Sequence, residues 1–145
     1  MRRFFKRNKS ELQVKDAVLQ RDGTPVTILI VDDSPTETHI LKGILERGGY
    51  QVITADNGER GVHTAIESNP SLILMDVVMP GLNGFQATRQ LSQTPETANI
   101  PIIMVSTKSQ ETDRAWGMRQ GARDYVVKPV SPNDLLEKIS VVLNV

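Results

Sequence analysis

Two adjacent carboxylates, Asp32 and Asp33, follow directly after an apolar stretch that ends at Val31. Two like charges at the end of a buried strand cost free energy unless a cation pairs with them. Asp76 follows a second apolar stretch, at residues 72–75, in the same way. Carboxylate oxygens are the ligands that Mg²⁺ prefers in proteins, and the ion would offset the repulsion between these acids. The sequence therefore predicts a magnesium site formed by the ends of strands.

A hydroxyl group and an ammonium group end two later apolar stretches, at Ser106 and Lys128. A carboxylate beside a bound metal ion can act as a nucleophile toward a phosphoryl group. The metal and a lysine would stabilise charge on the transferring oxygens, and a hydroxyl could hydrogen-bond the phosphate formed. Each residue alone is equally compatible with capping or with a solvated loop. Together they favour phosphoryl transfer to a carboxylate.

A regular alternation of strands and helices must bring these residues together. Strands are predicted at residues 26–31, 50–55, 72–76, 101–106 and 124–127. Helices are predicted at residues 34–49, 57–69, 85–93 and 110–122, and a last one starts at residue 132. Three of the strands are near-continuous apolar runs, which is typical of a doubly wound α/β parallel sheet with helices on both faces. Such sheets bind ligands at the carboxyl ends of their strands.

The start of the first helix has its own sequence signature. Ser34 is the predicted cap, Pro35 occupies the first helical position, and Glu37 is placed to complete a capping box. These three residues explain the helix start without either aspartate. Asp32 and Asp33 are therefore expected to be free for a metal ion.

Composition divides the chain into a basic extension and an acidic body. Residues 1–24 hold seven Lys/Arg and three Asp/Glu, a net of +4, whereas residues 25–145 hold ten and fourteen, a net of −4. We predict a flexible or briefly helical extension at residues 1–24, with the helix at 11–20, and one domain at 25–145. The balanced total charge favours no nucleic-acid partner. The lack of cysteine excludes thiol catalysis and cysteine zinc sites. No apolar run approaches the ~18 residues of a membrane span, so we expect a cytoplasmic protein without a transmembrane segment.

Four motifs together resemble the receiver domain of two-component response regulators, as in single-domain proteins of the CheY type. They are VDDS at 31–34, LMDVVMPGLNG at 74–84, MVST at 104–107 and YVVKPV at 125–130. The resemblance covers roughly residues 27–143. It implies a flavodoxin-like sheet of five strands in the order 2-1-3-4-5 with five helices. It also implies a signalling protein that is phosphorylated by a chemotaxis-type histidine kinase with Mg²⁺ or Mn²⁺, and not an enzyme.

The resemblance implies a role for each acidic residue. Asp76 corresponds to the phosphoacceptor and Asp33 to a direct metal ligand. Asp32 corresponds to the outer-shell acid, and Val78 to the residue whose backbone carbonyl binds the metal.

The remaining motif residues correspond to the switch. Ser106 matches the switch hydroxyl, Lys128 the lysine that contacts the phosphoryl group, and Tyr125 the aromatic residue that turns inward when Ser106 moves. The bond between Lys128 and Pro129 would be a cis peptide. In the helix at 110–122, the spacing of Ala115, Met118 and Ala122 predicts a core-facing side. Trp116 is then expected to be partly exposed. It is a candidate contact on the surface formed by the fourth helix, the fifth strand and the last helix, through which the resemblance implies that the signal leaves.

Longer stretches, including DDSPTE at 32–37 and MPGLNGFQATRQL at 79–91, resemble PilH-type regulators of twitching motility. This implies a motility or pilus protein as the downstream partner, and no DNA-binding helix-turn-helix is expected after Val145. A CheY-like regulator of another output and a phosphate sink remain open. A flavin or nucleotide-binding module is disfavoured, because the first loop is anionic. A phosphatase of the haloacid-dehalogenase type is disfavoured, because its two aspartates would be separated by one residue, whereas Asp32 and Asp33 are adjacent. A pseudo-receiver, which binds partners without phosphorylation, is disfavoured because the set of acidic residues is complete.

Overall fold

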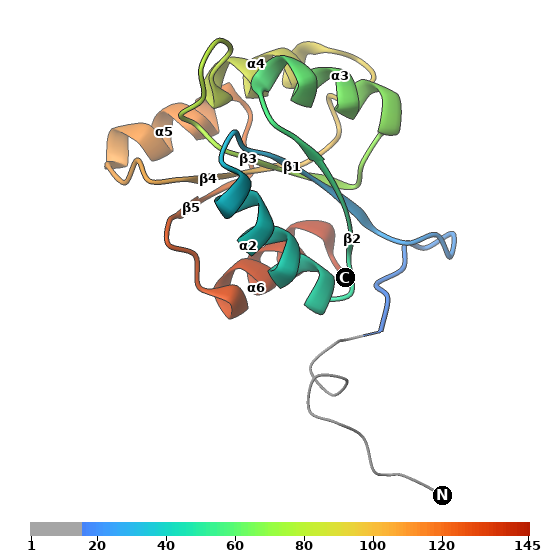
Figure 1. Cartoon of the computed structure of the whole chain (residues 1–145). Coiled ribbons are helices and arrows are strands. Elements are labelled where there is room, and N and C mark those ends of the chain that lie inside the picture. The colour runs from blue at the N-terminus through green and yellow to red at the C-terminus, as the bar shows by residue number, and fades with distance from the viewer. Residues whose placement is uncertain (1–15) are drawn as a thin grey trace, which may run out of the picture.

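A computed structural model describes residues 16–145 and shows a parallel sheet between two layers of helices (Figure 1). The strands are β1 (Thr27–Val31), β2 (Gln51–Ala55), β3 (Leu72–Met75), β4 (Ile102–Ser106) and β5 (Asp124–Val127). All neighbouring strands pair in parallel, in the order β2-β1-β3-β4-β5. The predicted fold class and strand order are confirmed.

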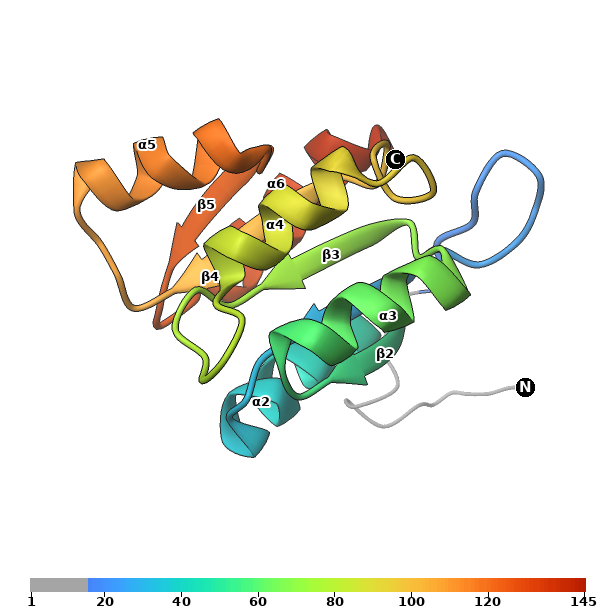
Figure 2. The same ribbon diagram turned by 90° about the horizontal axis from the view of Figure 1, so that it is seen from above.

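Five helices cover the two faces of the sheet. They are α2 (Pro35–Arg47), α3 (Gly58–Ser68), α4 (Gly84–Gln93), α5 (Glu111–Gln120) and α6 (Pro132–Leu143). Helices α2 and α6 lie on one face, and α3 and α4 lie on the other with α5 beside α4 (Figures 1 and 2). Ser34, the predicted cap of α2, accepts a hydrogen bond from the first turn of that helix, and Ser131 does the same for α6. The element bounds agree with the sequence prediction to within two residues, because caps and prolines mark these boundaries.

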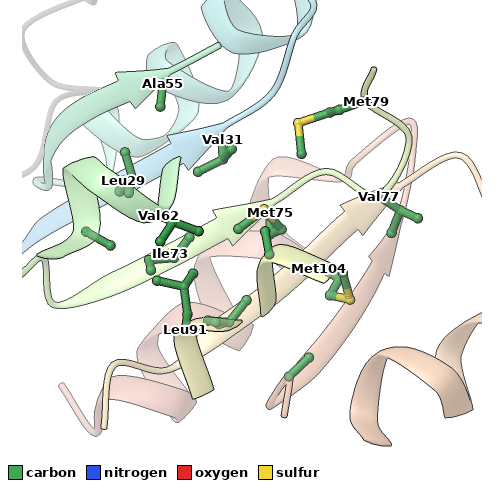
Figure 3. Packing of buried hydrophobic residues seen from close by; sticks show 14 of the residues in the cluster. Leu29, Val31, Ala55, Val62, Ile73, Met75, Val77, Met79, Leu91 and Met104 are labelled. Atoms are coloured by element: carbon green, nitrogen blue, oxygen red, sulfur yellow. The ribbon is translucent and has the colours of Figure 1, made fainter. Parts of the chain in front are cut away.

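Alternation along β1 divides the apolar core into two clusters. Ile28 and Ile30 pack with residues of α2 and α6, whereas Leu29 and Val31 pack with residues of α3 and α4 (Figure 3). All four side chains are fully buried. Each such side chain contributes about 1.5–3 kcal/mol through burial. The central strand is thus fixed from both sides, and the residues that follow it are held in place.

Helix α5 departs from the sequence prediction. Ala115, Met118 and Ala122 were expected to face the core. Ala122 is buried, as predicted, but Ala115 and Met118 are exposed, Met118 by 39%. The buried residues of α5 are Gly117 and Gln120. A Cβ added at Gly117 would lie 2.7 Å from the sulfur of Met104, so the helix backbone packs directly onto the sheet. The prediction was wrong because apolar spacing does not detect a contact face made by glycine.

Residues 16–24 run beside the sheet. Val18 donates its N–H to the carbonyl of Gly49 and accepts from the N–H of Val26, both at 2.9 Å. Residues 16–20 are not helical, so the helix predicted at 11–20 is absent from its described half; its other half lies outside the described residues. Within residues 16–145, no helix combines the length and the apolar character needed to cross a bilayer.

Candidate functional site

Three carboxylates meet at the carboxyl edge of the sheet. Asp32 and Asp33 follow β1, and Asp76 follows β3. Strands β1 and β3 are neighbours, with Val31 paired to Met75, so the next residues of both strands emerge side by side. One oxygen of each carboxylate lies within 4.8 Å of the others. The predicted convergence of these acids is confirmed.

The three acids differ in burial and in backbone contacts. Asp32 is 3% exposed and Asp76 is 8% exposed, whereas Asp33 is open to solvent. The Asp76 Oδ1 atom accepts a hydrogen bond of 2.9 Å from the N–H of Val77. Asp33 therefore offers a free-standing carboxylate beside two constrained ones.

The start of α2 uses one of these aspartates. Ser34 Oγ accepts from the N–H of Glu37 at 3.2 Å, as the capping prediction requires. The N–H of Ser34, however, donates to Asp32 Oδ1 at 2.9 Å and not to the Glu37 side chain. The prediction that neither aspartate takes part in the helix start was wrong for Asp32. The carboxylate of Glu37 turns instead toward Lys128.

Lys128 is the cation of the site. Its Nζ donates to Asp32 Oδ2 at 2.9 Å and lies 3.7 Å from Glu37 Oε1 and 3.8 Å from Asp76 Oδ1. The side chain is 9% exposed, and the peptide bond to Pro129 is cis, as the resemblance implied. Burial by itself would lower the pKa of Lys128. The hydrogen bond to Asp32 and the charges of the three acids outweigh it, so the pKa lies above its usual value.

The environment of Asp76 favours its neutral form. Burial raises the pKa of Asp76 to about 6, with a contribution from the charge of Asp32 and a smaller one from Asp33. Lys128 and the N–H of Val77 oppose this rise. At neutral pH the carboxylate is mostly ionised, but it is incompletely compensated. Such a group gains from an additional cation.

A glycine allows the loop after β3 to return against Asp76. The N–H of Gly84 donates to the carbonyl of Val77 at 2.9 Å. A Cβ at Gly84 would collide with the backbone oxygen of Asp76. Val78, within this loop, has a side chain that is 55% exposed. The closeness of Gly84 to the acid was not foreseen, although the glycine belongs to the LMDVVMPGLNG motif.

Ser106 and Tyr125 lie on β4 and β5. Ser106 is fully buried, and its Oγ accepts from the N–H of Lys108 at 3.2 Å. Tyr125 is 3% exposed, and its hydroxyl donates to the carbonyl of Lys108 at 2.7 Å. Burial raises the pKa of Tyr125. The aromatic ring is already turned inward in this structure.

Trp116 lies on the solvent side of α5. It is 46% exposed, as predicted, and the guanidinium carbon of Arg119 lies 5.9 Å from the centroid of its ring. The exposure leaves the indole accessible to a partner.

The donor set fits a divalent cation. Asp32, Asp33 and Asp76 bring three carboxylates together, and Lys128 supplies the neighbouring ammonium. Oxygen ligands that include an open carboxylate and leave room for water suit Mg²⁺. The acids converge without enough positive charge, so the residues present fit the ion that the sequence predicted.

A parallel sheet in this order, with an acidic group and a lysine at its carboxyl edge, is the arrangement of CheY-like proteins. The sequence profile of the response regulator receiver domain matches residues 28–140. The chain therefore belongs to the response regulator receiver domain family.

Relatives agree in sequence and in structure. The chain is 60% identical over 116 residues to Protein PilH of Pseudomonas aeruginosa PAO1. The aligned region covers 80% of this chain and 96% of that protein. It resembles the chemotaxis protein CheY4 of Vibrio cholerae with a TM-score of 0.76 and 29% identity, over 81% of this chain and 98% of CheY4. The receiver domain of the sensor histidine kinase PA1611 from P. aeruginosa PAO1 has a TM-score of 0.76 and 28% identity, over 82% and 98% of the two chains. That structure has a magnesium ion coordinated in its active site cleft.

Proposed function

We propose that the chain is a response regulator whose Asp76 accepts a phosphoryl group from a chemotaxis-type histidine kinase. Mg²⁺, or Mn²⁺, would be held by Asp33, Asp76 and the backbone carbonyl of Val78, with Asp32 in the outer shell. The observation that carries this proposal is a nearly buried lysine 3.8 Å from a carboxylate that lies among two further acids. The chain itself is the substrate, so we do not propose a separate enzymatic activity.

The chemistry at Asp76 is an in-line displacement. A carboxylate oxygen attacks phosphorus, a new O–P bond forms, and the N–P bond to the donor histidine breaks, after which the departing imidazole takes up a proton. The metal ion, when bound, neutralises charge on the phosphoryl oxygens. The ammonium of Lys128 would also compensate charge on these oxygens, and the Ser106 hydroxyl could hydrogen-bond one of them. The reaction requires ionised Asp76, and although its pKa is raised to about 6, the carboxylate is still mostly ionised at neutral pH.

The signal would leave the site through β4 and β5. Ser106 binds the N–H of Lys108, and Tyr125 binds the carbonyl of the same residue. A hydrogen bond from Ser106 to phosphate would compete with its contact to Lys108. Because Tyr125 already lies inward, we propose that this loop carries the change to the surface of α5, β5 and α6, where Trp116 is a candidate contact.

The output we propose is control of type IV pilus twitching motility through a motility or pilus protein, in the cytoplasm. Support comes from the 60% identity to Protein PilH along most of both chains. A CheY-like regulator of another output and a phosphate sink use the same site and differ only in the partner. The anionic loop after β1 favours neither flavin nor nucleotide binding.

Intact mass after incubation with acetyl phosphate and Mg²⁺ tests the proposal. The parent chain should gain the mass of one phosphoryl group, and Asp76→Asn should gain none. Asp56→Asn is the matched control, because Asp56 is an exposed acid at the end of the neighbouring strand β2. It should be labelled like the parent. Labelling that survives Asp76→Asn would place the acceptor elsewhere.

A further inference from the structure

Lys128 has one acidic neighbour that the proposed chemistry does not use. Its ammonium lies 2.9 Å from Asp32, 3.8 Å from Asp76 and 3.7 Å from Glu37. Glu37 belongs to the first turn of α2 and is not one of the three carboxylates that converge for a metal ion. Glu37 is thus a fourth carboxylate near the site, and it contacts the ammonium of Lys128.

Helix capping does not explain the side chain of Glu37. In a capping box this carboxylate would bind the N–H of Ser34, but that N–H is bound by Asp32. Only the backbone N–H of Glu37 takes part in the cap, through Ser34 Oγ. The carboxylate is thereby released from the helix end and faces Lys128.

We propose that Glu37 is a positioning residue that holds the ammonium of Lys128 on the α2 side of the site until a phosphoryl group occupies Asp76. This inference rests on the function proposed above. In the structure the ammonium is hydrogen-bonded to Asp32 and stands 3.8 Å from Asp76. The ammonium has three N–H donors, so phosphoryl oxygens on Asp76 would compete with the present partners for them.

Asp32 and Glu37 would release the ammonium of Lys128 in different ways. A cation that attracted Asp32 would weaken the hydrogen bond from Lys128 to Asp32, and Glu37 would be the remaining acid on that side. The Glu37 side chain is 39% exposed, whereas Lys128 is 9% exposed. Water can solvate the released Glu37 carboxylate, so the contact can be broken and remade. Glu37 thus opposes phosphoryl binding by competing for Lys128.

Affinity for beryllofluoride, an analogue of the phosphoryl group, measures this competition. The full chain is titrated with beryllofluoride at saturating Mg²⁺, and the bound fluorine signal is followed by ¹⁹F NMR. Glu37→Gln should bind about two- to fivefold more tightly than the parent, the range expected for loss of one partly exposed ion pair. Glu37→Asp keeps the charge on a shorter side chain and should restore affinity toward the parent value.

A matched charge control separates positioning from a general field effect. Asp56 lines the same cleft as Asp32 and Asp33 but pairs with Arg60, at 3.8 Å. Asp56→Asn removes the same charge as Glu37→Gln without touching Lys128, and should bind like the parent. An equal gain in both variants, or no gain in Glu37→Gln, would overturn the proposal. The thermal midpoint of each variant shows that the cap on α2 is intact, since that cap uses only the backbone of Glu37.

The same titration separates the phosphoacceptor role of Asp76 from the positioning role of Glu37. A parent chain that binds no beryllofluoride, or binds it equally after Asp76→Asn, overturns the proposed function and this inference with it. A parent that binds through Asp76 while Glu37→Gln binds no more tightly overturns only the role of Glu37.

Discussion

Strands β1 and β3 are hydrocarbon along their buried length, whereas the residues that follow them are carboxylates. From Ile28 to Val31 and from Leu72 to Met75 every side chain is buried and apolar. One residue further on, Asp32 and Asp76 are also nearly buried, but they are charged and share one lysine. The free energy of the interior depends on packing, and that of the edge depends on protons, metal ions and salt. The comparison predicts that the two regions respond to different perturbations.

A cavity in the interior should have the largest effect. Leu74 is 1% exposed. Leu74→Ala should lower the free energy of unfolding by about 3 kcal/mol, from lost burial and the cavity left behind. Urea denaturation at pH 5 and pH 8, with and without Mg²⁺, should give the same loss. Val141→Ala, at a residue 73% exposed, is the control and should change the value by less than about 0.5 kcal/mol. If the loss of unfolding free energy in Leu74→Ala varied with pH, the interior would not respond independently of the acidic edge, which would contradict the comparison.

Neutralising the edge should stabilise the metal-free protein. The pKa of Asp76 is about 6 when folded, against its ordinary value of 3.8, so the folded state binds more protons than the unfolded state between these two pH values. Stability from this group is present below about pH 4 and is lost as the pH rises through about 6. Asp76→Asn should therefore raise the free energy of unfolding by about 2 kcal/mol at pH 8.

The same variant should have a smaller effect at pH 5, where Asp76 in the parent is mostly protonated. Urea denaturation in the presence of EDTA at both pH values checks the difference. If Asp76→Asn were less stable than the parent at pH 8, the negative charge of Asp76 would already be compensated in the metal-free protein.

Magnesium should stabilise the edge by mass action. At about ten times its dissociation constant, the ion should add about 1.4 kcal/mol to the free energy of unfolding. Asp33→Asn should lose most of this gain at the same concentration, because Asp33 is the open carboxylate of the group. Thermal unfolding with increasing Mg²⁺ measures the effect, and Asp56→Asn should retain it. A full response in Asp33→Asn would remove Asp33 from the ligand set.

The smallest effect is expected where the edge is neutral. Tyr125→Phe removes the hydrogen bond of 2.7 Å to the carbonyl of Lys108 and leaves the ring in place. The free energy of unfolding should fall by about 0.5–1 kcal/mol, equally with and without Mg²⁺. Urea denaturation under both conditions checks this. A change that depended on the metal would connect Tyr125 to the acidic group more directly than the contacts indicate.

The sequence predicted those parts of the site that depend on topology. Parallel neighbours end at one edge, so the placement of Asp33 and Asp76 followed from the strands that precede them. The partners of Asp32 and Glu37 did not follow, because both acids flank Ser34 and either could bind its N–H. Which acid binds this N–H depends on the position of Lys128 after β5, and that position is set by the tertiary structure. The core face of α5 was mistaken for a similar reason: its closest contact is at Gly117, where no side chain marks it.

A crystal structure of the protein with Mg²⁺ and beryllofluoride tests the central claim most directly. We expect beryllium bonded to a carboxylate oxygen of Asp76, with Lys128 and Ser106 in contact with its fluorine atoms. Asp33 and Asp76 should both contact the metal ion. Beryllium bound at another carboxylate, or an unoccupied Asp76 at saturating reagent, would contradict the assignment of Asp76 as the phosphoacceptor.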